Sequence, residues 1–394
     1  MSSSRHSWMW FIPFALIFSL QVVPRFAEDS PTADEVVNIS DGYYYWKGDV
    51  VSDARHPPLA KGLQAFPLWF LGLDTHTRKA FADSAHRDYN FFFKLNPNRF
   101  TEMTACARMV TFLGGLGIGV LLFLIGRRES SAFLCVALWL WAFSPALLAF
   151  SGFSLSDIPL TVFFLAAVWW FNRSLEEPGA GPAGAAGFFS GMAILSKFSG
   201  VLLLPIFILL ELGSALGRKK ISGDWGRLAR RWAVGLSVLA GMIFLTYLPG
   251  TLWMDHRSPF VYFWKGFWAM EGLRGWPNYF RGILSTKYSL TYYPTAFLIK
   301  SPLSFLILLL SAMGLKIVRK IKVPLWHWLP PVVFFGAIMP FQDLGIREIL
   351  PIYPFLILVA ARAGEWMWNR RPRESWIFPV LLVGLLLFQG LSVG

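Results

Sequence analysis

The sequence predicts an all-α polytopic membrane protein with about 11 transmembrane helices. The chain has 394 residues, of which 55% are hydrophobic and only 15% are charged, whereas soluble domains are about 25% charged. The mean hydropathy is +0.50. Apolar runs long enough to cross a bilayer recur along the whole chain, and its 37 Phe, 19 Trp and 11 Tyr suit the two membrane interfaces. This composition argues against a soluble enzyme.

The charge balance and the cysteines narrow the class further. A net charge of +13 is compatible with nucleic-acid binding, but basic cytoplasmic loops that attract anionic membrane lipids explain it better. We therefore expect no nucleic-acid partner. The two cysteines, Cys106 and Cys135, both fall in predicted spans, so no disulfide framework or cysteine metal site is expected.

Eleven spans are expected, of which the fifth and sixth are short enough to merge into one. Residues 1–27 have a cleavable signal peptide as their alternative, although no clear small-x-small cleavage site follows. The predicted spans are 8–23, 103–126, 131–149, 158–172, 183–197, 199–217, 232–249, 296–314, 326–341, 348–361 and 376–393.

Basic residues in the short loops predict the orientation. They fall on one side if 183–217 is two spans, and Lys and Arg in short loops face the cytoplasm. Two long loops, about 24–102 and 250–295, then face outside, and the C-terminus does too. Both should contain short interfacial helices, such as Leu59 to Leu71, and no separate soluble domain is expected. The basic residues are Arg127, Arg128, Arg218, Lys219, Lys220, Arg227, Arg230, Arg231, Lys316, Arg319, Lys320, Lys322, Arg370, Arg371 and Arg373.

Acidic residues stand at two span boundaries. Asp34 and Glu35 follow the first span, where a partly desolvated carboxylate is well placed as a general base. The alternative is a pair of solvated loop acids. Asp157 begins the fourth span, where it is a functional candidate or, with Ser156, a helix cap ahead of Pro159.

Three cations stand at similar boundaries. Lys197 lies between the two short spans and either snorkels or meets an anionic phosphate. Arg347 begins a late span and suits phosphate oxygens, with a salt bridge to Asp343 or Glu348 as its alternative. Lys300 lies at an apolar helix entry.

The long loops supply the remaining candidates. His56 lies in the first loop near the cation Lys61, and Trp276 and Tyr279 of the second loop are placed to stack on a sugar or to lie in the interfacial belt. The six histidines show no metal-ligand spacing. The sequence contains no phosphate-cradling glycine loop and no nucleophile elbow, so ATP chemistry and serine hydrolysis are unsupported.

The common location of these residues carries more weight than any one of them. All fall on the outer face of the predicted topology. Acids and cations on one face suit a reaction in which an acid deprotonates an acceptor while cations hold a departing phosphate. The residues are Asp34, Glu35, His56, Lys61, Asp157, Lys197 and Arg347.

Five ordered motifs carry a family resemblance. They are the acid pair with Gly42–Asp49 and His56–Lys61, then Ser156–Leu160, Gly191–Phe198, Tyr292–Leu303 and Gly345–Phe355. Over nearly the whole chain, the sequence resembles the polyprenyl-phosphate-sugar-dependent glycosyltransferases of the GT-C fold. These include protein mannosyltransferases and bacterial aminoarabinose lipid A transferases.

The resemblance implies roles for these residues. Asp34 would be the general base, supported by Glu35, and Asp157 would orient the acceptor or the cations. Lys61, Lys197 and Arg347 would bind the donor phosphate of a polyprenyl-phosphate-linked sugar. The expected reaction inverts the anomeric centre without an obligatory metal, and the acceptor is a lipid, glycan or protein. A divalent metal ion is unsupported.

The chain also departs from the family pattern. Relatives often have a His soon after the acid pair and another after the late Arg, where this chain has Val36–Ile39 and Glu348. The lack of an extra luminal module favours a bacterial inner-membrane enzyme. A transporter or lipid flippase is the main alternative, but it would have charges near the membrane midplane and repeat-related halves. An inactive homologue is a further alternative.

Overall fold

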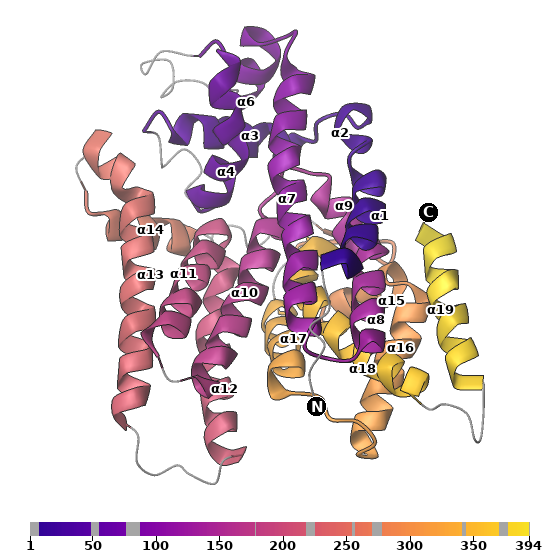
Figure 1. Cartoon of the computed structure of the whole chain (residues 1–394). Coiled ribbons are helices and arrows are strands. Elements are labelled where there is room, and N and C mark those ends of the chain that lie inside the picture. Colours follow the sequence, from indigo (N-terminus) through magenta and orange to yellow (C-terminus); the bar gives the residue numbers. More distant parts are fainter. Residues whose placement is uncertain are drawn as a thin grey trace.

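The computed structural model describes residues 8–48, 55–75, 87–177, 179–217, 225–253, 257–269, 278–340, 344–369 and 377–393. Helices dominate these residues, and long helices run between two ends of the molecule (Figure 1).

The first half of the chain contains η1 (Trp8–Trp10), α1 (Ile12–Val22), α2 (Arg25–Glu28), α3 (Ala33–Tyr45), α4 (Pro58–Ala65), η2 (Phe66–Leu71), α6 (Arg87–Tyr89), η3 (Asn90–Leu95), α7 (Phe100–Gly126), α8 (Ser131–Ala142), α9 (Pro145–Ser151), α10 (Asp157–Glu176) and α11 (Ala180–Ser196). The second half contains η4 (Phe198–Leu202), α12 (Leu203–Gly217), α13 (Trp225–Trp253), α14 (Pro259–Ala269), β1 (Asn278–Phe280), β2 (Ile283–Ser285), α15 (Tyr292–Lys300), α16 (Leu303–Ile317), α17 (Leu325–Ile338), η6 (Ile346–Ile352), α18 (Tyr353–Asn369) and α19 (Ile377–Val393).

The all-helical membrane architecture agrees with the sequence, but the expected count of eleven spans is not supported. Among the described residues, five helices are long and apolar enough to cross a bilayer, or up to seven if two bent pairs each count as one span. α17 and α19 are apolar but have only 14 and 17 residues, short of the ~20 that a bilayer requires. α18 carries Arg362 and Glu365, whose charges are costly in lipid.

The described part of the first long loop is a helical layer at the upper end of Figure 1. It has a small core of its own, which includes Ile39, Tyr44, Phe91 and Phe92. The expected helical segment Leu59 to Leu71 is confirmed as α4 followed by η2. α3 and α4 pack tightly because Gly42 has no side chain: a Cβ there would lie 2.0 Å from the carbonyl oxygen of Lys61.

The described part of the second long loop differs from expectation. It contains the expected short helix, α14, but also a two-stranded antiparallel sheet in which Tyr279 pairs with Leu284. Strands of three residues are too short to give a clear alternating pattern, so the sequence did not predict them.

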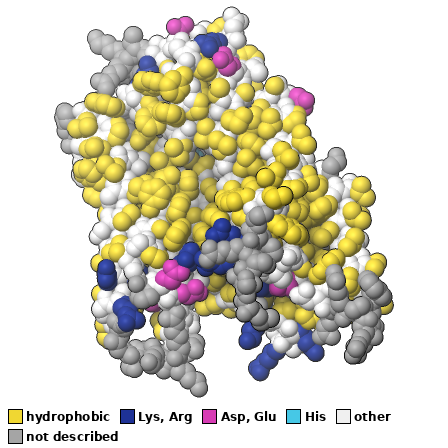
Figure 2. Space-filling view, viewed as in Figure 1, with side chains coloured by type: hydrophobic (Ala, Val, Ile, Leu, Met, Phe, Trp, Pro, Cys, Tyr) yellow, Lys and Arg dark blue, Asp and Glu magenta, His cyan; other side chains and the backbone are white. Residues whose placement is uncertain are grey.

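α10 and α11 form an antiparallel hairpin that contributes side chains to the main core. Their long contact places the first residue of α10 beside the last residue of α11. On the face that Figure 2 shows, hydrophobic side chains cover the middle, and most of the visible Lys and Arg side chains lie toward the lower end.

Candidate active site

The first turn of α3 is fixed by a capping box. Thr32 is the N-cap: its hydroxyl accepts a hydrogen bond from the amide of Glu35, and the Glu35 carboxylate accepts one from the amide of Thr32. Each side chain thereby satisfies a backbone donor that the helix leaves unpaired. This cap sets where α3 begins, and Asp34 is held in its first turn.

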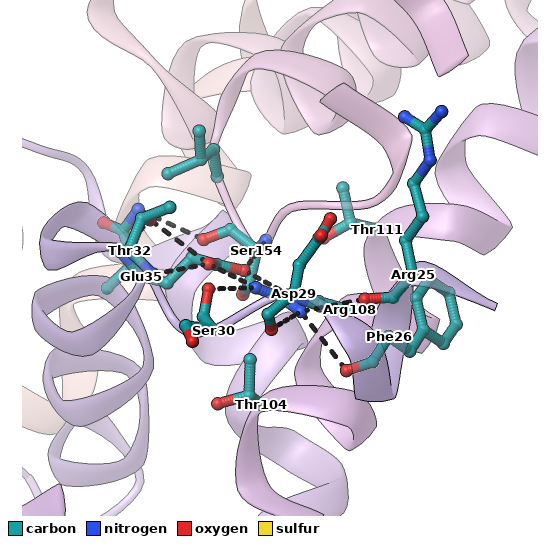
Figure 3. A network of polar contacts seen from close by, with 12 residues as sticks. Arg25, Phe26, Asp29, Ser30, Thr32, Glu35, Thr104, Arg108, Thr111 and Ser154 are labelled. Atoms are coloured by element: carbon teal, nitrogen blue, oxygen red, sulfur yellow. Dashed lines mark hydrogen bonds and ion pairs between the residues drawn. The ribbon is translucent and has the colours of Figure 1, made fainter. Parts of the chain in front are cut away.

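Glu35 is the centre of a buried network that Figure 3 shows from close by. Arg108 of α7 donates to both carboxylate oxygens of Glu35 at 2.8 Å, and both side chains are fully buried. The amide of Ser154 donates to the same carboxylate at 2.8 Å. The guanidinium also reaches four backbone carbonyls, including those of Asp29 and Ser30. One ion pair therefore ties α2, α3, α7 and the segment before α10 together.

Asp34 points away from this network and meets Arg347. The Arg347 Nη1 atom lies 2.6 Å from the Asp34 Oδ2 atom. The Asp34 side chain is 56% exposed and that of Arg347 is 29% exposed. Arg347 belongs to η6, which follows Gly345 at φ +101°, a conformation that favours glycine.

A second group of charges adjoins this pair. The Lys197 Nζ atom lies 2.8 Å from a carboxylate oxygen of Asp157 and 2.8 Å from one of Glu348. Lys197 directly follows α11 and Asp157 begins α10, so the hairpin brings them together. Glu348 comes from η6, and its carboxylate is 3.9 Å from the Arg347 Nε atom.

These five side chains form a row of alternating charge: Asp34, Arg347, Glu348, Lys197 and Asp157. Burial alone would lower the pKa of Arg347, but the carboxylates of Asp157, Asp34 and Glu348 outweigh it and raise that pKa. The guanidinium therefore stays charged. The row has three anions and two cations, so it can accept a proton at Asp34 while offering cations to a phosphate.

Lys61 belongs to a separate buried cluster. Its Nζ atom lies 2.9 Å from the Asp41 carboxylate, which also pairs with Arg87. Arg87 in turn contacts Asp88 at 3.0 Å. Asp41 lies seven residues after Asp34 on the same face of α3, roughly 10 Å along the helix axis.

The structure brings four of the predicted site residues into one row: Asp34, Asp157, Lys197 and Arg347. Of three other predicted residues, His56 is half-buried, while Tyr279 on β1 and Lys300 at the end of α15 are exposed. Trp276 lies outside the described residues. No group of three or more His, Cys, Asp or Glu side chains is placed to hold a metal ion in the described part of the chain.

Sequence reasoning missed Arg108, Asp41 and Arg87, and it named Glu348 only as a partner of Arg347, whose Nε atom lies 3.9 Å away. The pattern Thr32-x-x-Glu35 is the signature of a capping box and would have shown that Glu35 has a structural task. Arg108 is an isolated charge in the long apolar run of α7, which indicates a buried partner. The pairing of Glu348 with Lys197 and those of Asp41 and Arg87 had no comparable signal, because they depend on how distant helices meet.

Comparisons with known proteins agree with this fold. Residues 90–250 match the sequence model of a family described as dolichyl-phosphate-mannose-protein mannosyltransferase. A search of curated protein sequences found no match.

Two crystal structures of ArnT from Cupriavidus metallidurans resemble the chain. The apo state gives a TM-score of 0.65 at 16% sequence identity and covers 98% of this chain and 63% of ArnT. The state bound to undecaprenyl phosphate gives 0.63 at 17% identity and covers 98% of this chain and 65% of ArnT. The chain thus spans less than two thirds of the ArnT length.

The fold is that of a helical protein with several helices that could cross a membrane, and it is similar to the fold of ArnT. The family resemblance expected from the motifs is confirmed as a resemblance: residues 90–250 match the dolichyl-phosphate-mannose-protein mannosyltransferase model, and the fold is similar to that of ArnT.

Proposed function

We propose that the protein is an inverting glycosyltransferase that moves a sugar from a polyprenyl-phosphate carrier to an acceptor hydroxyl or amine. Asp34 acts as the general base, and Arg347 and Lys197 hold the donor phosphate. The membrane architecture and the family match support the class. The contact between Asp34 and Arg347 is the observation that supports this division of roles.

The reaction is a single displacement. The acceptor oxygen or nitrogen forms a bond to the anomeric carbon from the face opposite the phosphate. The bond from that carbon to the phosphate oxygen breaks, and its electron pair stays on the phosphate. Asp34 takes the acceptor proton, and the cations stabilise the charge that develops on the phosphate.

Asp34 suits the base because it is the exposed acid of the pair. Its side chain is 56% exposed, whereas that of Glu35 is fully enclosed and holds Arg108. A base must reach the proton that it removes. Glu35 therefore supports catalysis by fixing the first turn of α3, and Asp157 does so by holding Lys197.

Arg347 is positioned to change partner when donor binds. A guanidinium binds phosphate through two parallel hydrogen bonds, and the exposed pair with Asp34 costs little to break. A donor phosphate at Arg347 would release the Asp34 carboxylate for the acceptor. The base is thus freed in the presence of the leaving group.

The orientation forms part of the proposal. Arg127 and Arg128 directly follow α7, while Arg108, which holds Glu35, lies 19 residues before Arg127, roughly 28 Å along that helix. If the basic loops face the cytoplasm, the charged row lies at the outer, periplasmic face of a bacterial inner membrane.

The test uses the purified full-length protein and a panel of polyprenyl-phosphate sugars. Release of polyprenyl phosphate that depends on an added acceptor supports the transferase. Movement of intact donor between the leaflets of a vesicle, with no release, would establish a lipid flippase instead. If no donor in the panel gives either release or movement, the proposal is overturned.

A further inference from the structure

A second candidate site lies at the opposite end from the charged row. A cavity of about 460 Å³ opens between the ends of α7, α10 and α12 and the start of α17. Its size is within the range of small-molecule sites. The residues of the proposed reaction do not line it, so it requires an explanation of its own.

Two adjacent arginines give the cavity its charge. Arg127 is half-buried and Arg128 is exposed, and both line the cavity. Within the described residues neither guanidinium has a hydrogen bond or an ion pair. Of the other charged residues in the lining, Glu129 pairs with Arg362 and Arg173 with Glu177, while Glu176 accepts a hydrogen bond from the neutral Asn172. In the described part of the chain, the cavity therefore has two cations without an ion-pair partner against one carboxylate without one, and it keeps a net positive charge.

A buried histidine points independently to a ligand. His327 lines the cavity and is only 1% exposed, yet its Nδ1 atom has no hydrogen-bond partner among the described residues. An unpaired buried polar atom is costly, and a phosphate oxygen placed in the cavity would provide a partner. Trp326 packs edge-on against the same ring and also lines the cavity.

The surroundings suit a lipid. Three helices end and one begins around the cavity, as expected at the level where headgroups lie. α12 carries the exposed apolar side chains Ile208, Leu209 and Leu212 and forms one wall of the cavity through Leu210 and Gly213. An acyl chain would lie along this helix while its headgroup occupies the cavity.

We propose that this cavity binds the phosphate of an anionic membrane phospholipid. Arg127 and Arg128 supply the attraction, and His327 donates or accepts the inner hydrogen bond. Basic pockets between helices at a membrane surface bind lipid headgroups in this way. This lipid site takes no part in the proposed transfer reaction.

The test compares lipid binding by the wild-type protein with binding by variants in which cationic side chains are replaced by neutral ones. The full-length protein in phosphatidylcholine nanodiscs is titrated with phosphatidylglycerol, and bound lipid is measured by native mass spectrometry together with the midpoint of thermal unfolding. The double variant Arg127→Gln/Arg128→Gln should bind phosphatidylglycerol roughly 30-fold more weakly, because each basic residue near an anionic surface contributes about a fivefold gain. Its thermal shift should vanish.

The matched control is Arg319→Gln/Lys320→Gln, which removes two exposed charges that do not line the cavity and should keep wild-type binding. A third variant, Ser214→Phe, fills the cavity without altering charge and should also lose binding. An equal loss of phosphatidylglycerol binding in both double variants would show non-specific attraction and overturn the site. Unchanged phosphatidylglycerol binding in both Arg127→Gln/Arg128→Gln and Ser214→Phe would also overturn it.

A separate arm replaces the lipid with inorganic phosphate. If phosphate alone raises the unfolding midpoint as much as phosphatidylglycerol at the same concentration, the cavity takes a free anion and the lipid assignment is overturned. We expect phosphate to give little shift, since it lacks the acyl chains that would lie along α12.

Discussion

The guanidinium of Arg347 lies 2.6 Å from the carboxylate of Asp34, although 313 residues separate them in the chain. In the proposed reaction these are the phosphate-binding cation and the base. Their contact holds the two side chains against each other, and in the proposed reaction substrate separates them.

Removing the base is the first test of this arrangement. Asp34→Asn keeps the shape of the side chain but cannot take a proton, so transfer should fall about 10²- to 10⁴-fold. The measurement is acceptor-dependent release of polyprenyl phosphate. Glu28→Gln, which changes an exposed acid nearby, should remain active. Full activity of Asp34→Asn would remove Asp34 from its role while leaving the lipid cavity untouched.

Arg347 should matter for donor use and very little for stability. Its ion pair with Asp34 is partly exposed, and such pairs contribute about 0–1 kcal/mol. A charge-assisted hydrogen bond to phosphate contributes more, so Arg347→Ala should lower kcat/KM for the donor about 10- to 100-fold.

The control for this prediction is Arg173→Ala. Arg173 pairs with Glu177 at a similar exposure but at the other end of the molecule. Both variants should unfold within a few degrees of wild type. A large loss of stability in Arg347→Ala alone would mean that Arg347 is structural.

Breaking the buried ion pair between Glu35 and Arg108 should mainly lower stability, in contrast to Arg347→Ala. Glu35→Gln leaves the charge of Arg108 uncompensated in a fully enclosed site, which typically costs about 3–5 kcal/mol. The midpoint of chemical unfolding should fall accordingly. Glu102→Gln, in an exposed pair with Arg99, provides the comparison and should cost no more than about 1 kcal/mol. Equal losses of stability in Glu35→Gln and Glu102→Gln would contradict the structural role of Glu35.

Lys197 lies between two carboxylates, so removing its charge should lower the midpoint of thermal unfolding more than removing the charge of either carboxylate. Lys197→Met leaves Asp157 and Glu348 facing each other without a cation. Glu348→Gln keeps the Lys197 contact with Asp157 and should be milder. Thermal unfolding of the two variants at neutral pH measures the difference, and the reverse order would show that Glu348 rather than Lys197 holds the segment.

Asp88 gives a pH-dependent prediction. Burial raises the pKa of Asp88 and nearby Asp41 adds to the rise, which Arg87 opposes. The folded state therefore binds this proton more tightly than the unfolded chain does, so stability falls as the pH rises from the ordinary value of 3.8 through the raised pKa. Asp88→Asn should raise the unfolding midpoint at pH 7, and the gain should vanish near pH 3.

A large part of the fold follows from local sequence. The apolar runs identify helices such as α7 and α13 because a helix that crosses a bilayer needs about 20 consecutive, mostly apolar residues. The expected count of eleven spans is not supported among the described residues, where helices such as α18 and α19 are too charged or too short to meet the criteria for a span. The strands β1 and β2 were missed because three residues carry almost no periodic signal.

The site was predictable in kind but not in its contacts. Asp34, Asp157, Lys197 and Arg347 were recognised because charged residues beside apolar runs stand out. Their grouping into one row depends on the α10–α11 hairpin and on η6, and no local pattern reports how those elements meet. The same applies to Lys61, which pairs with Asp41 in a separate cluster.

By itself the sequence determined the class of the protein, its helices and the residue types from which a site could be built. These depend on hydrophobic length, charge placement and motif order, all of which are local properties. Only the tertiary structure decided that Glu35 is buried against Arg108 while its neighbour Asp34 faces Arg347. Adjacent residues on a helix point in different directions, so the packing of α7 and η6 around α3 assigns one acid to the core and the other to the site.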